Sequence, residues 1–389
     1  MKKKVAIAIS GGVDSGVAAA LVVKAGYQAA GFYMHLWVEP QSYLRGGACD
    51  EAARKTAHQL GIPFYIVDLE KIFKKKVVDY FLKEYSLGRT PNPCIMCNRF
   101  IKFEELMSHA KGLGYDYLAT GHYARIVEVT SDQQPVTRKS KNRSPITGYR
   151  LLQGVDKAKD QSYFLYNLTQ KRLAQVMFPV GNYLKTEVIK MARKWKLPVA
   201  ERPESQEICF FKESDYRPFL KRQIKKKIIP GDVVDTKGKV IGKHRGLPLY
   251  TIGQRHGFRI QSSAIGDQLS VIPPYYVVRK DVKKNQLIVG FGKEAEKKEF
   301  LVKDVNWIAP DYQSLITNHQ LQCQVRIRHQ GELLPAKLSI INYQLSISLN
   351  ESERGVAPGQ AVVFYQGEET LGGGIIATQP GVYLVNTRC

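Results

Sequence analysis

The chain has 389 residues, which is enough for a large core and for two or three domains of ordinary size. Its 58 Lys and Arg residues outnumber 35 Asp and Glu residues, so the formal net charge is +23. This charge favours a polyanionic partner. Nucleic acid ranks above a membrane surface, because the basic residues are spread along the chain without an amphipathic anchor.

Secretion and membrane insertion are both disfavoured. The N-terminal apolar run, Val5 to Ile9, is too short for the core of a signal peptide or for a membrane span. The cysteines are too sparse for the disulfide framework of a secreted scaffold; they are Cys49, Cys94, Cys97, Cys209, Cys323 and Cys389. We therefore expect a cytoplasmic protein with no membrane association, in which any disulfide bond is transient and catalytic.

The first third of the chain alternates short β-branched runs with helical patterns. The expected strands are Val5 to Ile9, Ala29 to Trp37, Phe64 to Leu69 and Tyr117 to Thr120. The expected helices are Val13 to Ala25, Asp50 to Leu60, Ile72 to Tyr85 and Phe100 to Gly112. This order predicts an α/β fold, a doubly wound, Rossmann-like parallel sheet. Ligands of such sheets bind beyond the carboxyl ends of the strands, where Ser10 to Ser15, Met34 and Gly121-His122 are expected to gather.

Composition divides the rest of the chain. Residues 130–148 are polar and basic and predict a mobile surface insertion, and Thr169 to Lys196 predicts a helix that completes a first domain at residue 215. Residues 216–279, which include the basic run Lys221 to Lys227, predict a small central domain. Residues 280–389 predict a C-terminal β-barrel. The strands expected in this last part are Tyr276 to Val278, Leu287 to Val289, Gln322 to Ile327, Leu345 to Leu349 and Ala361 to Tyr365.

A glycine-rich turn, S-G-G-V-D-S at Ser10 to Ser15, follows the first strand. Its glycines let the backbone approach a phosphate closely, and its hydroxyls and amides supply donors. The lysine of the common P-loop is missing. Asp14 would suit a divalent cation such as Mg²⁺ between phosphates. The string resembles that of the PP-loop ATP pyrophosphatases, which cleave ATP between the α and β phosphates.

The string T-P-N-P-C-I-M-C-N, at Thr90 to Asn98, places Cys94 and Cys97 between prolines and asparagines. Its spacing alone fits a metal clip, a redox pair or a sulfur-handling site. A structural pair for Cys94 and Cys97 and a buried thiol for Cys209 are the ordinary alternatives.

Further strings accompany these two motifs. They are G-H-Y-A-R (Gly121 to Arg125), K-D-Q-S-Y-F-L (Lys159 to Leu165), S-Q-E-I-C-F (Ser205 to Phe210), G-Q-R-H-G (Gly253 to Gly257) and L-G-G-G-I-I (Leu371 to Ile376). Together, and in this order, they resemble the tRNA-specific 2-thiouridylases of the MnmA/TrmU family. The resemblance runs from Val5 to Ile376.

The resemblance implies ATP-dependent 2-thiolation of the wobble uridine in tRNAs of the Lys, Glu and Gln type. The C2 oxygen is adenylated, sulfur from a cysteine persulfide replaces it, and AMP and pyrophosphate are released. Cys209 matches the persulfide carrier, and Cys97 matches the thiol that attacks it and closes a transient disulfide, which a reductant reopens. The implied partners are the tRNA anticodon arm and a persulfide donor protein or cysteine desulfurase. The free protein is expected to be a monomer.

The resemblance also assigns binding residues. Those implied for ATP are Ala8, Ile9, Ser10, Gly11, Gly12, Val13, Asp14, Ser15, Met34 and Gly121. Those implied for the target base are Asn92, Pro93 and Cys94, and those implied for the rest of the tRNA are His122, Lys159, Asp160, Gln161, Arg328, His329 and Gln360. The 130–148 insertion and the Lys221 to Lys227 run are further candidates for the anticodon arm.

One residue departs from the family's pattern. Many members have Asp where this chain has Cys94, so Cys94, Cys97 and Cys209 could instead hold a [4Fe-4S] cluster for the same thiolation. A four-thiolate zinc site is least favoured, because no fourth ligand is evident. Two further alternatives are a PP-loop amide-forming ligase and a non-catalytic RNA-binding module with a structural C-x-x-C.

Overall fold

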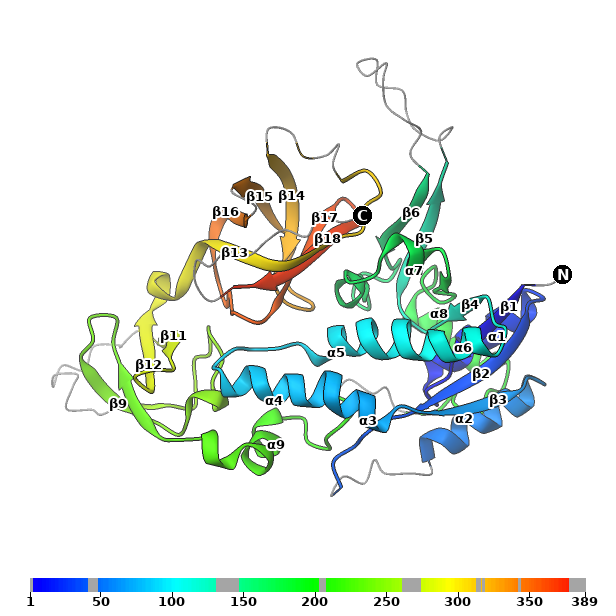
Figure 1. The fold of residues 1–389 in the computed structure, drawn as a ribbon, viewed down its shortest axis with the longest axis horizontal. Helices are drawn as coiled ribbons and strands as arrows, with labels where there is room; N and C mark the ends of the chain where they lie inside the picture. The colour runs from blue at the N-terminus through cyan, green and yellow to red at the C-terminus, as the bar shows by residue number, and fades with distance from the viewer. Residues whose placement is uncertain are drawn as a thin grey trace, which may run out of the picture.

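The computed structural model describes residues 3–40, 48–130, 147–202, 208–260, 274–312, 316, 319–341 and 344–377. It has three parts, each built around its own sheet (Figure 1). In that view the N-terminal parallel sheet lies at the right, the middle sheet at the left and the C-terminal barrel above, while two long helical segments run beneath the barrel from one sheet toward the other.

The N-terminal sheet is parallel and has the strand order β3-β2-β1-β4-β7. Its strands are β1 (Lys4–Ala8), β2 (Gln28–His35), β3 (Phe64–Asp68), β4 (Tyr117–Ala119) and β7 (Val176–Met177). The chain moves outward from β1 to β3 and then returns to the other side of β1 at β4, so the topological switch point lies between β1 and β4. The predicted doubly wound parallel sheet is confirmed.

Helices connect these strands, and several run on without a break. They are α1 (Val13–Lys24), α2 (Ala48–Gln59), α3 (Glu70–Phe73) with η1 (Lys74–Val78) and α4 (Asp79–Ser86), α5 (Pro93–Met96) with η2 (Cys97–Leu106) and α6 (Met107–Gly112), η4 (Ser162–Leu165), α7 (Gln170–Leu173) and α8 (Lys185–Lys194). The segments η1 and η2 have π-helical hydrogen bonding, which occurs frequently at functional sites.

Two predictions about these helices were wrong. The segment Thr169 to Lys196 is not one helix: it folds as α7, the strand β7 and α8. A two-residue strand has no period that a sequence pattern could reveal. The helix expected from Phe100 begins at Pro93 instead, because the side chain of Asn92 caps it by accepting a hydrogen bond from the Cys94 amide at 3.1 Å, and proline suits the first helical position.

The middle part begins with α9 (Tyr216–Gln223) and η5 (Lys225–Lys227), in which all three lysines are exposed. Its sheet has the order β10-β9-β8-β12-β11. The strands are β8 (Gly231–Val234), β9 (Val240–His244), β10 (Arg259–Ile260), β11 (Tyr275–Asp281) and β12 (Gln286–Phe291), with η6 (Leu247–Leu249) after β9. The domain boundary expected at residues 279–280 falls inside β11. Both β11 and β12 belong to the middle sheet, because β12 pairs with β8 on one side and with β11 on the other.

The C-terminal part is a closed antiparallel barrel of six strands, in which β13 pairs with both β16 and β18. Its elements are β13 (Glu296–Trp307), β14 (Gln320–Arg326), β15 (Leu334–Ile341), β16 (Gln344–Arg354), β17 (Ala361–Gln366) and β18 (Glu369–Ile376), preceded by η8 (Gly292–Ala295). This confirms the predicted barrel.

A hairpin of β5 (Ala124–Val129) and β6 (Gly148–Gln153) leaves the N-terminal part and joins β18 at its edge. Most of the insertion predicted at 130–148 lies outside the described residues. Barrel residues Ala361, Val363 and Tyr365 are fully buried in the same apolar cluster as Phe32, Phe81 and Ile101 of the N-terminal part, so the two parts share one core. No helix within the described ranges has the length and apolar character needed to span a membrane.

Candidate active site

The S-G-G-V-D-S loop follows β1 at the switch point and is braced internally. The amide of Ser10 donates to the Ser15 hydroxyl at 3.2 Å, and that hydroxyl donates to the carbonyl of Gly12 at 3.0 Å. Gly12 then occupies the cap position of α1, where no side chain of the described residues accepts from the first amides. The first turn of a twelve-residue helix therefore offers free N–H groups, an arrangement suited to phosphate.

Asp14 projects from this loop into a polar cluster. Its Oδ1 accepts a hydrogen bond from the Tyr123 hydroxyl at 2.8 Å and forms an ion pair with Lys185 Nζ at 2.6 Å. Lys185 is the first residue of α8, and its side chain is only 12% exposed. A lysine missing from the loop sequence is thus supplied at the loop by a distant helix.

Gly121, just beyond β4, lies against the same loop. A Cβ on this glycine would stand 2.7 Å from the Ser15 nitrogen and 2.8 Å from the Asp14 carbonyl carbon, so the close backbone approach requires glycine. Met34 lies near the end of β2, half-buried against the core. The carboxyl ends of β1 and β4 therefore meet as the strand order predicted.

The C-x-x-C motif forms the start of a helix. Pro93 to Met96 make α5, and Cys97 opens η2. Cys94 is exposed and Cys97 is 8% exposed. Asn98 is buried and donates to the carbonyl of Phe164 at 3.2 Å, which ties this helix to the K-D-Q-S-Y-F segment.

Cys209 comes from a different segment and meets this helix. Its neighbour Phe210 is buried among Phe73, Phe81 and Phe219, and the Phe210 carbonyl accepts from the amide of Glu39 at 3.0 Å. These contacts anchor Cys209, while Ser205 to Glu207 of the same motif lie outside the described residues.

The three cysteines Cys94, Cys97 and Cys209 are free thiols that lie close enough to influence one another. Desolvation, followed by the neighbouring Cys97 and Cys94, raises the pKa of Cys209 to about 12. Desolvation and then Cys97 raise the pKa of Cys94 to about 11, and desolvation raises that of Cys97. As residues, Cys94 and Cys209 are nevertheless exposed, whereas Cys97 is buried.

Lys102 is the cation that opposes these shifts, since it lowers the pKa of all three thiols. It lies five residues after Cys97, which is one turn of the π-helix. Its Nζ is 3.5 Å from His122 Nε2, and His122 Nδ1 is 2.7 Å from the Thr120 hydroxyl. An ammonium group only donates, so Nε2 accepts and the imidazole proton sits on Nδ1. Burial, then Lys102, lowers the pKa of His122 well below its usual value, so this histidine is neutral.

Replacing Lys102 by Met is expected to slow alkylation of Cys97 by iodoacetamide at neutral pH, because losing the cation raises the pKa of the Cys97 thiol and lowers its thiolate fraction. In the unsubstituted protein the alkylation rate should rise with pH through the neutral range, since the thiol is protonated there. Peptide mass spectrometry of the alkylated protein measures both effects. Lys102→Arg is the control, because it keeps the charge; equal rates for Lys102→Met and the unsubstituted protein would contradict the assignment.

The residues of the K-D-Q-S-Y-F segment have different environments. The Asp160 side chain is fully buried: Oδ1 accepts from the amides of Gly154 and Ser162, both at 3.1 Å, and Oδ2 accepts from Arg326 at 3.0 Å. Gln161 accepts from the Tyr123 amide at 3.1 Å, and Lys159 is half-buried. The Asp160 carboxylate therefore has no surface for direct contact with RNA in this conformation, and His122 is likewise only 7% exposed.

Arg328 and Gln360 line a recess of about 580 Å³ between the barrel and the middle part. Its other walls include Thr251, Gly253 and Arg354. The Arg328 side chain is half exposed and contacts Glu353 at 3.3 Å. His329 lies outside this lining, with its ring 4.3 Å from that of Phe164.

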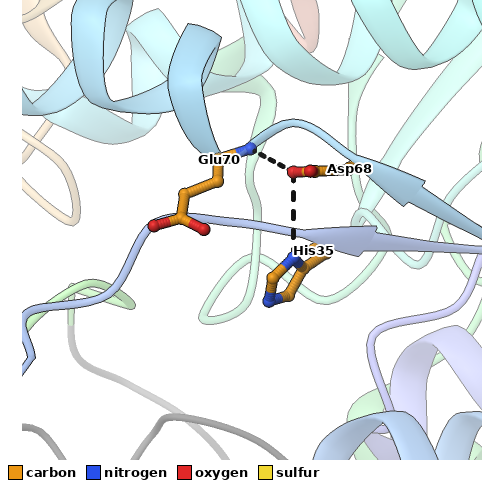
Figure 2. A group of neighbouring side chains, drawn as sticks. All are labelled: His35, Asp68 and Glu70. Atoms are coloured by element: carbon orange, nitrogen blue, oxygen red, sulfur yellow. Dashed lines mark hydrogen bonds and ion pairs between the residues drawn. The ribbon is translucent and has the colours of Figure 1, made fainter.

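A separate group of possible metal ligands lies at the ends of β2 and β3 (Figure 2). His35 Nδ1 is 3.8 Å from Asp68 Oδ1, which also accepts from the Glu70 amide at 3.0 Å. Side chains of His35 and Asp68 are more than half exposed. Exposed acidic groups of this kind are common without an ion, so no role is assigned to them.

Sequence reasoning missed Lys185 and Lys102 as members of the site. Lys185 lies 171 positions from Asp14, and nothing in its own K-T-E setting announces the pairing. Lys102 could have been suspected from its position five residues after Cys97 in the R-F-I-K-F string. That spacing brings Lys102 near Cys97 only because the helix is π-helical there.

Three family profiles match the chain in succession. They are described as the tRNA methyl transferase HUP domain over residues 3–213, the tRNA methyl transferase PRC-barrel domain over 217–291 and the aminomethyltransferase β-barrel domain over 297–376. These limits agree with the three sheets.

Curated relatives match over nearly their whole length. The tRNA-specific 2-thiouridylase MnmA of Carboxydothermus hydrogenoformans is 42% identical over 384 residues, covering 96% of this chain and 98% of the relative. That of Chloroflexus aggregans is 43% identical over 379 residues, with the same shares. A solved structure of the U34-tRNA thiolase NcsA from Methanococcus maripaludis, with its [4Fe-4S] cluster, is similar at 18% identity and a TM-score of 0.33, covering 58% of this chain and 65% of that one. A TM-score this low assigns nothing to the site.

Proposed function

The chain belongs to the family of tRNA-specific 2-thiouridylases (MnmA), and from this membership we propose that it replaces the C2 oxygen of the wobble uridine in tRNA by sulfur at the expense of ATP. The observation that carries the proposal is the position of two adjacent residues. Gly121 contacts the phosphate loop, and His122 contacts Lys102 beside the three thiols. An ATP-activated atom and a sulfur nucleophile would therefore meet in one site.

The first step uses the phosphate loop. The uracil C2 oxygen attacks the α-phosphorus of ATP, the bond to the β-phosphate bridge breaks, and pyrophosphate leaves. The free amides at the start of α1 and the Lys185 ammonium fit the negative charge of the phosphates. Within the described part of the chain, Tyr123 and Lys185 both contact Oδ1 of Asp14, so Oδ2 could hold a Mg²⁺ ion delivered with ATP. The ion would neutralise phosphate charge there.

The second step uses the cysteines. We propose that Cys209 receives a terminal sulfur from a donor protein or cysteine desulfurase, which its exposure permits. The Cys97 thiolate attacks the inner sulfur of that persulfide, a Cys97–Cys209 disulfide forms, and hydrosulfide is released. The hydrosulfide attacks C2 of the adenylated uracil, the C2–O bond breaks, and AMP leaves. A cellular reductant then reopens the disulfide.

For tRNA binding we propose the recess lined by Arg328 and Gln360, together with the exposed lysines Lys225 to Lys227 of η5. Arginine and lysine suit phosphate contacts, which supply affinity without reading sequence. Asp160 and His122 act indirectly in this account, since both side chains are buried. The target uracil must leave the stacked anticodon to reach the site. It would be bordered by Asn92, Pro93 and Cys94, at the start of the helix of α5 and η2 that carries Cys94 and Cys97, here called the cysteine helix.

A second version of the chemistry stays in view because Cys94 adds a third thiol within electrostatic range of Cys97 and Cys209, and a cluster with one open iron needs three protein ligands. Cys94, Cys97 and Cys209 would hold such a [4Fe-4S] cluster, which would supply an iron site for sulfide. The persulfide route predicts that anaerobically purified protein is colourless and iron-free and still thiolates tRNA, and that Cys94→Asp retains activity within about threefold. Iron analysis, visible absorption and thiolation assays check this. Activity that depends on iron and is lost in Cys94→Asp would favour the cluster.

Release of AMP tests the proposal against the other two functions. With a sulfur donor supplied, a 2-thiouridylase forms AMP only when tRNA is present, because AMP leaves when sulfur attacks the adenylated base. An amide-forming ligase would form it with a small acceptor and without any need for Cys97 or Cys209, and an RNA-binding module would form none. tRNA-independent AMP formation, or its complete absence, would overturn the proposal.

A further inference from the structure

The cysteine helix is approached by a short connecting segment, Leu87 to Asn92, that leads from α4 to α5. Its first half is fixed to the helix it leaves. The Arg89 amide donates to the Glu84 carbonyl at 2.9 Å, and the Arg89 side chain makes two hydrogen bonds of 2.5 Å to the Glu84 carboxylate, which is only 9% exposed. The segment therefore starts from a fixed point.

Its second half is fixed to the barrel. The Thr90 amide donates to the Pro358 carbonyl at 2.9 Å, and Thr90 is 6% exposed. Gly359 follows Pro358 and has a φ of +92°, a conformation that favours glycine. A Cβ on Gly359 would stand 3.0 Å from both the Arg89 Cβ and the Thr90 nitrogen and 3.2 Å from the Thr90 oxygen. Two backbones touch here, and a methyl group on Gly359 would fit only if the Arg89–Thr90 backbone gave way.

The barrel side of this contact is itself rigid. The Gly359 amide donates to the Ile376 carbonyl at 3.0 Å, and the Ile376 amide donates to the Gln360 carbonyl at 2.9 Å, so the turn is bound to the last strand of the barrel. A shift at Gly359 would therefore be taken up by the connecting segment and not by the barrel.

The cysteine side transmits such a shift. Thr90 is separated from Cys94 by Pro91, Asn92 and Pro93, and the two prolines restrict the backbone of the residues before them as well as their own. Asn92 adds its hydrogen bond to the Cys94 amide. A displacement of Thr90 therefore moves the start of the helix that carries Cys94 and Cys97.

We propose that Gly359 is a positioning residue for the sulfur-transfer step: the barrel turn Ala357 to Gln360 sets the place of the cysteine helix through the backbone of Thr90. Because Gln360 of the same turn lines the recess beside Arg328, the turn also joins the proposed RNA-binding surface to the thiols. This inference rests on the proposed function, since it concerns the rate at which sulfur reaches the activated base.

The test compares Gly359→Ala with Gly367→Ala. Both glycines are in the barrel at positive φ, +92° and +58°, but a Cβ on Gly367 meets nothing within 4 Å. Strain from a positive φ is thus common to both variants, and only Gly359→Ala displaces Thr90. We expect Gly359→Ala to lower the single-turnover thiolation rate about 3- to 10-fold, because contacts of 3.0 Å require the Thr90 backbone to give way and a misplacement of about 1 Å can cost a factor of about 100. Its tRNA dissociation constant should stay within about twofold of that of Gly367→Ala.

Thr90→Pro is the second variant. It removes the donor to Pro358 and leaves the sequence of the barrel turn unchanged, and it should lower the same rate with tRNA affinity kept. Thermal unfolding establishes that each variant is folded, and if Gly359→Ala does not fold, Thr90→Pro decides. The inference is overturned if thiolation by the folded variant matches that of Gly367→Ala, or if the loss lies in tRNA affinity alone. An unsubstituted protein that does not thiolate tRNA would instead refute the proposed function, so the two failures are distinguishable.

Discussion

Replacing either Cys97 or Cys209 by Ser is expected to lower tRNA thiolation by at least about 10³-fold, as the loss of a covalent nucleophile does in other enzymes. A hydroxyl neither carries a persulfide nor ionises at neutral pH. The step before sulfur transfer does not use these thiols, so both variants should still form pyrophosphate from ATP in a tRNA-dependent first turnover. Quench-flow measurement of pyrophosphate and nucleoside analysis of the tRNA separate the two steps.

Cys323 supplies a matched control for these variants. It lies on β14 of the barrel, pairs with Ala336 across the sheet and, like Cys209, has a pKa raised to about 12 by burial. Cys323→Ser should thiolate at the unsubstituted rate. If Cys97→Ser or Cys209→Ser retains more than a tenth of the activity, the assignment of these thiols is refuted.

Replacing Asp14 by Asn is expected to lower the ATP-dependent step about 10²- to 10³-fold, the effect of removing one preorganised charged group from an active site. The substitution removes the counterion of Lys185, whose side chain is only 12% exposed, and takes away the carboxylate that would hold Mg²⁺. Persulfide loading of Cys209 should be unchanged, because the sulfur centre does not include Asp14. Tyrosine-to-phenylalanine replacement at Tyr123 removes a single hydrogen bond to Asp14 and should cost about tenfold or less.

Pyrophosphate formation in the first turnover at saturating ATP and tRNA compares the two variants, and mass spectrometry of Cys209 after incubation with a sulfur donor checks the loading. An Asp14→Asn variant with near-normal pyrophosphate formation would show that the loop does not carry the chemistry assigned to it.

Strong local signals made the geometry of the glycine-rich loop predictable. The loop at Ser10 to Ser15 follows a buried β-branched strand and opens a helix of small residues, and the parallel order brings Gly121 against it as expected. The cysteine helix was predicted to start at Phe100, where the apolar periodicity begins. It starts at Pro93, because Asn92 is its N-cap and Pro93 its first residue. The barrel was predicted correctly from its short strands, but its first residue was placed inside β11. The sequence near β12 does not show that β12 pairs with β8 and so belongs to the middle sheet.

Long-range pairings account for the rest. The approach of Lys185 to Asp14 joins residues far apart in the chain, and Arg326 reaches Asp160 across two domains. Asp160 shows the limit of motif matching: its string was recognised and an RNA contact was inferred, whereas the side chain is buried and ion-paired. A motif identifies which residues matter, but burial decides whether they touch the substrate or hold the residues that do.

Nucleoside mass spectrometry of tRNA, after incubation with the protein, ATP, Mg²⁺ and a cysteine desulfurase with cysteine, tests whether the protein thiolates the wobble uridine. We expect sulfur in place of oxygen at C2 of that uridine, formed only when ATP is present and lost in Cys209→Ser. Sulfur at another nucleoside, or none while AMP accumulates, would contradict this expectation.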